Sequence, residues 1–317
     1  MGSIVLSADN TPPALCCPSD RAPLQRAGDA MHCPVCARDY AIRDGVVDFL
    51  GKDDPFYEGA FNNEVRYVPR SRNFLHQMPL WLISNGYLWA VRKALNQGAR
   101  VVELGCAGGV AWLGTQYQVI GVDVSQQGLA LAAKKYSLCV RSDSLKPIPD
   151  GSVDAVISSY FWEHIAADDK EAILDEVARI LKPGGQVIFI YDVATHNPLI
   201  SWLRARNPQL YQASFLDADG HIGYQSVAQN EALFLKHGLR ITKSHSLERT
   251  PLQSTSVYLK MKRWNGSAKW FGRVLSVLDR KPILLPYQAF LRLIDETVGR
   301  LFPSAWGRMA ITVAQKP

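Results

Sequence analysis

The chain has 317 residues, of which 47% are hydrophobic and 20% charged, an ordinary balance for a globular protein. This composition excludes a disordered or fibrous chain, and the length favours one full-size domain with further segments at its ends. The formal net charge of +6 permits an anionic partner without requiring one. We find neither an apolar run long enough to cross a membrane nor a signal peptide, so the six cysteines indicate a reducing, cytoplasmic environment.

Residues 1–51 are predicted to form a small β-rich module. The segment contains two cysteine clusters, Cys16-Cys17 and Cys33-Pro34-Val35-Cys36. Asp44-Gly45 lies between two apolar stretches, which is the usual sequence signal of a two-residue hairpin turn. Residues 52–98 follow as a polar, aromatic linker and one amphipathic helix over residues 75–96.

Strand and helix signals alternate from residue 99 onward. Short apolar runs bounded by turn residues predict parallel strands joined by helices, which is a Rossmann-like architecture. We expect Ser125 to cap the first of two helices and a residue near Asp168 to cap the second. The expected strands are residues 101–104, 119–124, 138–140, 153–158 and 186–191, and the expected helices are residues 125–135 and 168–181.

The C-terminal part is predicted to complete this domain and to contain an insertion within it. A helix over residues 225–237 and strands over residues 239–246 and 309–314 give a domain composed of residues 99–249 and 308–317. Residues 250–307 form an insertion with nine Lys or Arg residues, three acidic residues and many aromatic ones, which we expect to be helical. A lid over the acceptor, a homodimer face and a peripheral membrane contact are the roles it could fill. RNA binding is less consistent with its apolar residues, which indicate a packed face: Val274, Leu275, Val277 and Leu278.

A glycine-rich turn after the first expected strand is the strongest functional signal. The sequence Glu103-Leu104-Gly105-Cys106-Ala107-Gly108-Gly109 lets the backbone approach a ligand closely and leads into a helix N-terminus. Asp123 follows twenty positions after Glu103, at the end of the second strand, where a carboxylate can accept the hydroxyls of an adenosine ribose. The pair predicts an adenosine-containing ligand at the carboxyl ends of the strands.

These motifs resemble the class I methyltransferases that use S-adenosylmethionine (SAM), particularly the small-molecule branch that includes ubiquinone and menaquinone biosynthesis. The resemblance covers residues 100–191 and includes Leu181-Lys182-Pro183-Gly184-Gly185, a turn that nicotinamide dehydrogenases lack. It implies a seven-stranded, mostly parallel sheet whose last strand is antiparallel. Ala107 departs from the middle glycine of the family motif. The SAM-binding residues implied by the resemblance are Glu103, Gly105, Ala107, Gly109, Asp123, Val124, Asp143, Ser144 and Tyr160.

The cysteine segment resembles a small zinc-ribbon-like module that precedes some methyltransferase domains and is a separate activator subunit of others. Cys33 and Cys36 have the spacing of half a zinc site. The upstream half has Cys17 followed by Asp20 in place of a second cysteine, so the candidate ligands of a structural zinc are Cys17, Asp20, Cys33 and Cys36. The alternative is a metal-free β-module with reduced thiols in its core.

Two histidines are candidates for the general base that an alcohol or phenol acceptor requires. His164 follows the fourth expected strand, and His221 lies in the loop before the helix at residues 225–237. Tyr160 and Trp162 could form walls of the methyl-transfer site. A role for His164 at a helix cap or at the edge of SAM remains an equal alternative.

The sequence therefore predicts a SAM-dependent methyltransferase of a biosynthetic pathway. The expected acceptor is a small molecule, a glycan or a lipid-linked molecule, methylated on oxygen. One alternative is an rRNA base methyltransferase, against which the absence of the usual Asn/Asp-Pro-Pro-aromatic motif argues. The other is a non-catalytic partner that uses the fold for assembly.

Overall fold

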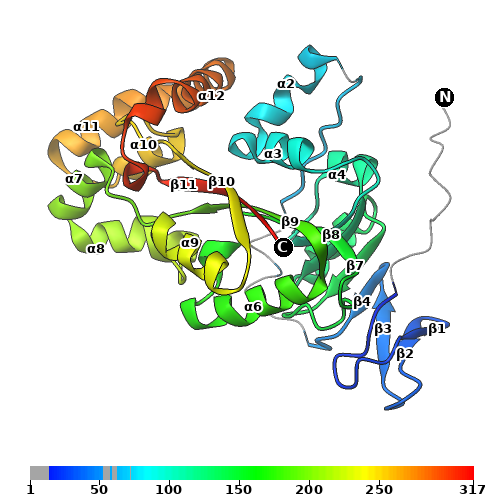
Figure 1. The fold of residues 1–317 in the computed structure, drawn as a ribbon. Helices are drawn as coiled ribbons and strands as arrows, with labels where there is room; N and C mark the ends of the chain where they lie inside the picture. The colour runs from blue at the N-terminus through cyan, green and yellow to red at the C-terminus, as the bar shows by residue number, and fades with distance from the viewer. Residues whose placement is uncertain (1–13, 53–57, 59–62, 72) are drawn as a thin grey trace.

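The computed structural model describes residues 14–52, 58, 63–71 and 73–317 (Figure 1). Its centre is one continuous sheet in the order β1-β2-β3-β4-β7-β6-β5-β8-β9-β11-β10. The strands are β1 Gln25–Ala27, β2 Ala30–His32, β3 Asp39–Arg43, β4 Val46–Asp48, β5 Arg100–Leu104, β6 Gln118–Asp123, β7 Leu138–Arg141, β8 Val153–Ser159, β9 Leu181–Asp192, β10 Arg240–Leu247 and β11 Met309–Gln315.

The strands of the Rossmann-like part have the predicted directions. The five strands β7, β6, β5, β8 and β9 are parallel, and β11 is antiparallel to both β9 and β10. The predicted count of seven strands is not confirmed for the sheet as a whole, which has eleven, because the N-terminal module adds four strands at the β7 edge. β9 also begins five residues earlier than expected, since the Lys182-Pro183-Gly184-Gly185 segment extends the strand.

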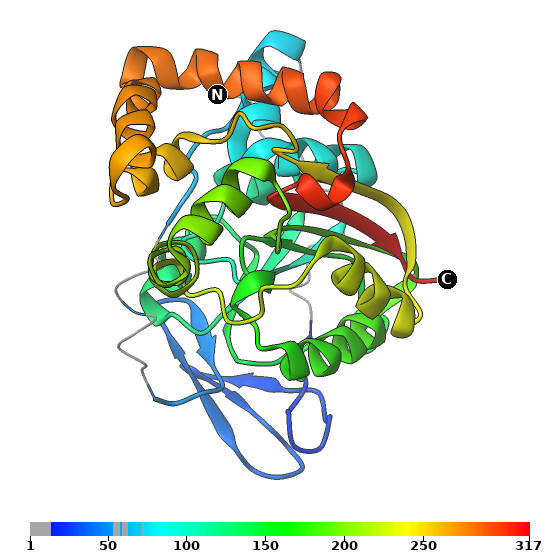
Figure 2. The ribbon, with the colours of Figure 1, turned by 90° about the vertical axis from the view of Figure 1, so that its left-hand side faces the viewer.

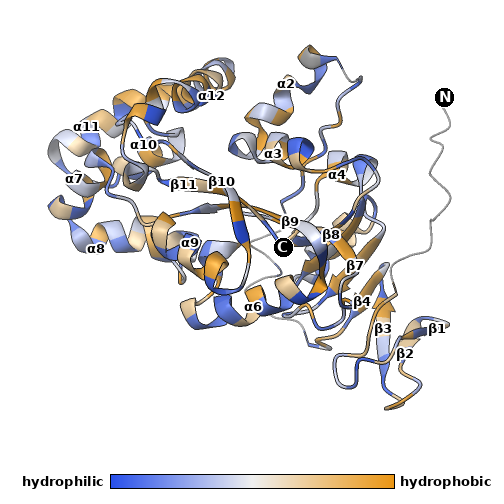
Figure 3. Cartoon of the chain, in the orientation of Figure 1, coloured by the Kyte–Doolittle hydropathy of each residue, from blue (hydrophilic) through white to orange (hydrophobic). Residues whose placement is uncertain are grey.

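The two faces of the sheet are buried by different helices. Because successive side chains of a strand point to opposite faces, Val101 packs with α3, α4 and α5, whereas Val102 packs with α6 and α9. The apolar colouring of the central strands in Figure 3 corresponds to these two cores. The bounds of these helices are α3 Tyr87–Ala94, α4 Ala111–Gln116, α5 Gln126–Ala132, α6 Ala167–Ile180 and α9 Val227–Lys236.

The predicted single helix over residues 75–96 is wrong. It is divided into α2 (Phe74–Leu82), a short 3-10 segment (η1, Ile83–Gly86) and α3. Ser84, Asn85 and Gly86 all have positive φ angles, so the chain turns sharply where the apolar periodicity suggested continuity. The expected cap near Asp168 is also wrong, since α6 begins at Ala167 and has no side-chain cap.

The Asp44-Gly45 hairpin is confirmed, and it brings the N-terminal module to the sheet. Both residues have positive φ angles, and β3 pairs with β4 on either side of the turn. β4 then pairs in parallel with β7. Next to this junction, Arg141 Nη1 lies 3.2 Å from Asp48 Oδ2, and both side chains are only 1% exposed.

We predict that Asp48→Ala destabilises the whole chain by about 3 kcal/mol, because it breaks the buried ion pair between Asp48 and Arg141. Urea unfolding of the full chain measures this effect. Asp39→Ala is the matched control, since Asp39 is in the same module but its side chain is 66% exposed. Equal unfolding midpoints for the two variants would contradict the prediction.

Residues 250–307 are largely helical, as predicted, and they lie against the end of the sheet where β9 and β11 meet (Figures 1 and 2). Two unpredicted helices from the segment after β9 pack against them in a separate apolar cluster. None of the helices in the described part of the chain is both long and apolar enough to span a bilayer. The helices of this region are α7 Pro198–Arg206, α8 Pro208–Tyr211, α10 Thr255–Met261, α11 Gly266–Leu275 and α12 Lys281–Glu296.

Candidate active site

The glycine-rich turn leaves β5 in a left-handed backbone conformation. Gly105 and Gly109 have φ angles of +63° and +73°. A Cβ atom on Gly105 would lie 2.3 Å from Phe161 Cδ2, so this position has no room for a side chain. Ala107 has a φ of +44° and therefore adopts the conformation that the missing family glycine would favour, at a cost of about 1–2 kcal/mol.

Asp123 connects the two strand tips. Its Oδ2 atom accepts a hydrogen bond of 2.8 Å from the Ala107 N–H, and its Oδ1 atom accepts hydrogen bonds from Val124 and Ser125. Burial raises the pKa of Asp123 above its usual value, although these N–H groups act in the opposite direction. A carboxylate has about four acceptor positions, so at least one remains for a ligand hydroxyl.

A cavity of about 520 Å³ lies at these strand tips, within the usual size range of small-molecule sites. The structure brings all nine predicted SAM-binding residues to its walls. It also adds residues that we did not predict. The lining includes Glu103, Gly105, Ala107, Gly109, Asp123, Val124, Asp143, Ser144 and Tyr160, with the unpredicted Asn63, Val65, Ser84, Ser142, Leu145, Phe161 and Ile222 among the others.

The unpredicted contribution of residues 63–65 comes from backbone pairing. The Asn63 carbonyl accepts a 2.8 Å hydrogen bond from Gly108, and Val65 forms a parallel bridge with Val110. A segment forty residues upstream thus covers the glycine turn. Backbone pairing of this kind has no side-chain signature, so sequence patterns could not reveal it.

Glu103 lies in the floor of the cavity and is buried. Tyr136 donates its hydroxyl to Glu103 Oε2, and the Tyr136 hydroxyl in turn accepts a 2.7 Å hydrogen bond from the Val110 N–H. Burial raises the pKa of Glu103 to about 8, against the effect of the Tyr136 hydrogen bond. Glu103 therefore links the turn to the core in addition to facing the cavity.

The two predicted histidines lie together, but only His164 lines the cavity. Its Nδ1 atom is 2.9 Å from the Gly220 carbonyl, which can only accept, so Nδ1 carries a proton and, in the neutral ring, the lone pair is on Nε2. His221 lies behind it, with a ring-centre distance of 5.4 Å. His221 Nε2 is 3.7 Å from Asp192 Oδ2, and burial lowers the pKa of His221.

Trp162, which we expected at the methyl-transfer site, is instead part of the core. Its ring is fully buried between Phe189 and Phe234, and its Nε1–H donates to Asn230. Tyr160 does reach the site, because its positive φ turns the side chain away from the strand direction. The Tyr160 hydroxyl accepts a 2.5 Å hydrogen bond from the side chain of Asn85.

A second cavity, of about 390 Å³, also has Tyr160 in its wall. Its lining is polar, and its charged groups are paired: Arg308 lies 2.9 Å from Glu248 and 3.6 Å from Asp192, and Lys260 pairs with Asp219. Asp192 Oδ1 and Arg292 Nη1 are buried and have no hydrogen-bond partner among the described residues. The charged residues in the lining are Asp192, Asp219, Glu248, Lys260, Arg292, Asp295 and Arg308.

The insertion and the N-terminal helices close this second cavity from two sides. Arg292, on α12, packs so tightly against η1 that a Cβ atom on Gly86 would lie 2.5 Å from its Nη2 atom. The guanidinium also lies over the ring of Trp81 on α2. Neither contact was predicted, because they join segments two hundred residues apart.

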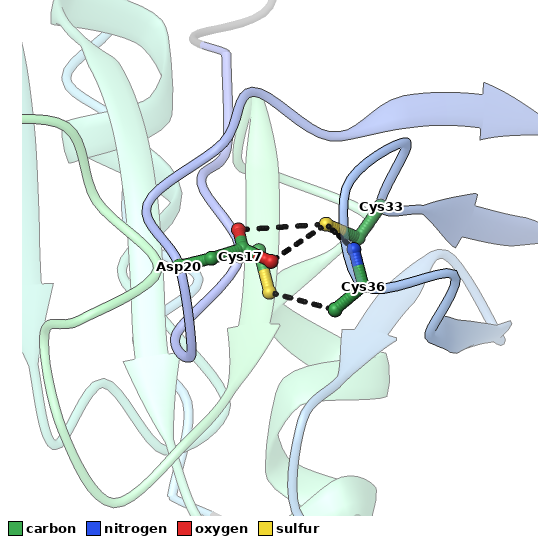
Figure 4. Close-up of side chains that lie close together, drawn as sticks. All are labelled: Cys17, Asp20, Cys33 and Cys36. Atoms are coloured by element: carbon green, nitrogen blue, oxygen red, sulfur yellow. Dashed lines mark hydrogen bonds between the residues drawn. The ribbon is translucent and has the colours of Figure 1, made fainter.

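The four candidate metal ligands form one cluster, shown in Figure 4. Their ligand atoms all lie within 4.8 Å of one another. Cys17 Sγ is 3.6 Å from Cys36 Sγ, and Cys33 Sγ is 3.3 Å from Asp20 Oδ2. Zn–S bonds of about 2.3 Å in a tetrahedron place sulfur atoms about 3.8 Å apart, so the donor set fits zinc. Cys16 is buried outside the cluster, with its N–H bonded to the Pro147 carbonyl.

The central segment of the chain matches a known protein family. Residues 102–189, which contain the glycine turn, Asp123, Asp143 and His164, match the family model of a methyltransferase domain. The chain carries a class I, SAM-dependent methyltransferase domain. Residues 13–45 match a second family model, that of Trm112p-like proteins, which agrees with the predicted zinc-ribbon-like module.

The matches to curated relatives cover less than half of this chain. The tRNA (carboxymethyluridine(34)-5-O)-methyltransferase ALKBH8 of Mus musculus is 36% identical over 100 residues, which are 30% of this chain and 15% of the mouse protein. The ubiquinone biosynthesis O-methyltransferase of Thiobacillus denitrificans is 30% identical over 113 residues, 32% of this chain and 47% of that protein. Both matches thus span less than half of the relative.

Among solved structures, the phosphoethanolamine N-methyltransferase 2 of Haemonchus contortus in complex with SAM has a TM-score of 0.47 and 18% identity. The alignment covers 74% of this chain and 52% of that chain.

For the module that precedes the methyltransferase domain, we predict about one zinc ion per chain, because four donors converge with tetrahedral spacing. Elemental analysis of the purified full chain measures the zinc content. Cys36→Ser is expected to lower it strongly, whereas Cys16→Ser, outside the cluster, is expected to leave it unchanged. Protein that stays free of zinc after incubation with the metal would contradict the assignment.

Proposed function

We propose that the chain transfers a methyl group from SAM to a hydroxyl group of a polar small molecule. One observation supports this most: Tyr160 is shared by the predicted SAM cavity and by a separate polar cavity. Methyl transfer requires the donor and the acceptor to meet in line at one point. We infer that the two cavities adjoin at Tyr160, since it lines both.

When bound, SAM supplies a methyl group activated by the positive sulfur, so the protein mainly positions the acceptor. In this proposal, Asp123 accepts hydrogen bonds from the ribose hydroxyls of SAM, and Asp143 contacts the adenine. His164 Nε2 is the proposed acceptor of the hydroxyl proton. Because His164 lines the SAM cavity and not the second one, the acceptor in this proposal extends its hydroxyl past Tyr160 into the SAM cavity. His221 is proposed to support His164 from behind rather than to contact the acceptor.

The second cavity favours a neutral, hydrogen-bonding acceptor. Its four carboxyl groups and three cationic groups leave no surplus positive charge for a phosphate or a nucleic acid backbone. Buried charged and polar groups are equally unsuited to a long acyl or prenyl chain. Among the described residues, Asp192 Oδ1 and Arg292 Nη1 lack hydrogen-bond partners. They offer one acceptor and one donor, which matches a molecule with several hydroxyl groups.

The test uses SAM carrying tritium in its methyl group, incubated with the full chain and an extract of the cells that produce it. We expect tritium to enter neutral, water-soluble small molecules and not RNA or protein. Asp123→Ala, which removes the ribose contact, serves as the negative control. Label in RNA would instead favour the alternative suggested by the tRNA-modifying relative, and SAM binding without any transfer would favour a non-catalytic assembly partner.

We also propose that residues 1–51 act as a built-in stabilising module of residues 99–249 and 308–317. The β4–β7 pairing and the buried Asp48–Arg141 pair support this role. A module fused to the chain would replace the contacts that a separate activator subunit makes with other methyltransferases. Residues 250–307 then serve as the wall of the acceptor cavity.

A further inference from the structure

The outward face of α12 is apolar although it is exposed to solvent. Leu285, Pro286, Ala289, Phe290 and Leu293 follow one side of the helix at spacings of one, four, five and eight residues. Leu285 and Leu293 are 61% and 56% exposed, and Phe290 is 47% exposed. The opposite side is buried through Tyr287, Leu291, Arg292 and Asp295. The exposed apolar side therefore lies opposite the side through which α12 packs within this chain.

The neighbouring helix α11 repeats this arrangement. Trp270 is 60% exposed, and Phe271, Val274 and Val277 continue an exposed apolar stripe toward α12. The 3-10 segment Ser276–Asp279, which carries Val277, contacts both helices. The packed face that we expected for Val274 and Val277 was wrong, since both side chains are exposed. Both helices lie on the outer side of the insertion, away from the sheet (Figures 1 and 2).

The insertion that carries these stripes exposes mostly positive charge. Six exposed basic residues of the insertion face solvent, against one exposed acidic residue, Asp279. The basic residues are Lys262, Arg263, Arg273, Arg280, Lys281 and Arg300. An apolar face with a basic fringe is complementary to the surface of a bilayer that contains anionic lipids, where the apolar side chains enter the headgroup boundary and the cations meet the lipid charge.

We propose that the outer faces of α11 and α12 dock on an anionic lipid bilayer. A second copy of the chain is a poorer occupant, because a two-fold interface would bring the same basic residues of both copies together. Nucleic acid is poorer still, since much of the face is aliphatic, as at Leu285, Leu293 and Val274, and such side chains neither bind phosphates nor stack on bases. Docking here leaves the methyltransferase domain in the aqueous phase, with the wall of its polar cavity next to the membrane.

Sedimentation with vesicles tests this proposal. The full chain is mixed with vesicles of phosphatidylcholine alone and of phosphatidylcholine with phosphatidylglycerol. We expect binding to the anionic vesicles to be at least about tenfold stronger and to weaken as salt is added. Phe290→Gln with Leu293→Gln is expected to reduce binding about tenfold or more, and Arg280→Gln with Lys281→Gln to remove most of the preference for phosphatidylglycerol.

The control is Leu235→Gln, which removes a leucine of similar exposure, 58%, on α9 outside the insertion. This variant is expected to bind as the unchanged chain does. Sedimentation equilibrium of the same variants in the absence of lipid shows whether the face joins two copies instead. Absence of vesicle binding, equal loss in the Leu235→Gln control, or a dimer that Phe290→Gln with Leu293→Gln separates would each overturn the proposal. None of these outcomes depends on methyl transfer.

Discussion

Replacing Asp123 by alanine is expected to lower the affinity for SAM by on the order of a hundredfold, because hydrogen bonds to a charged carboxylate contribute about 1.5–3 kcal/mol each. The substitution also removes the acceptor of the Ala107, Val124 and Ser125 N–H groups, so the two strand tips lose their connection. Isothermal titration calorimetry of the full chain with SAM measures the change.

Two further variants separate the ribose contact from general damage to the turn. Asp123→Asn keeps one acceptor oxygen and is expected to lose less affinity than Asp123→Ala. Asp175→Ala, whose side chain is 74% exposed on α6, is expected to bind SAM normally. A folded Asp123→Ala variant that binds SAM as tightly as the unchanged chain would show that the ligand site has been misplaced.

Replacing His164 by alanine is expected to lower kcat by about 10²–10⁴, the usual contribution of a general base. SAM affinity is expected to change far less, because the imidazole lies at the edge of the cavity and not at the ribose or the glycine turn. The initial rate of S-adenosylhomocysteine formation, once an acceptor from the labelling experiment is available, gives kcat and KM separately.

His221 provides the informative comparison, because it contacts Asp192 but does not line the predicted SAM cavity. We expect His221→Ala to lose activity less than His164→Ala does. His237→Ala, at the end of α9, should have no effect. Full activity in both the His164 and the His221 variants would mean that no histidine acts as the base, and a larger loss in the His221 variant would reverse their roles.

Most of the Rossmann-like part could be predicted from the chain itself. Each strand there is a short apolar run between turn residues, and Gly238 ends α9 with a φ of +74° at the expected place. The prediction of one helix over residues 75–96 was wrong, because the apolar periodicity continues through Ser84-Asn85-Gly86 although the backbone turns there. Ser84-Asn85-Gly86 was the sequence signal for this turn, but the apolar pattern on both sides of it favoured a continuous helix.

The candidate site was partly predictable, because several of its residues lie at the ends of predicted strands. Gly105, Asp123 and Asp143 are found by their positions relative to strand ends, because parallel strands bring their carboxyl ends to one edge. Trp162 was misplaced, since position after a strand does not tell which way a ring points. Arg292 and Asp192 come from segments far apart in the chain, so their meeting in one cavity could not be read from local patterns.

By itself, the amino-acid sequence determined the alternation of strands and helices, the glycine turn with its acidic partners and the spacing of the cysteines, because these depend on interactions between near neighbours. Only the tertiary structure decided that the module extends the sheet through β4, that the insertion closes a charge-paired cavity and that α12 turns an apolar side outward. Those features depend on which distant surfaces are buried together, and burial is a property of the whole packed chain.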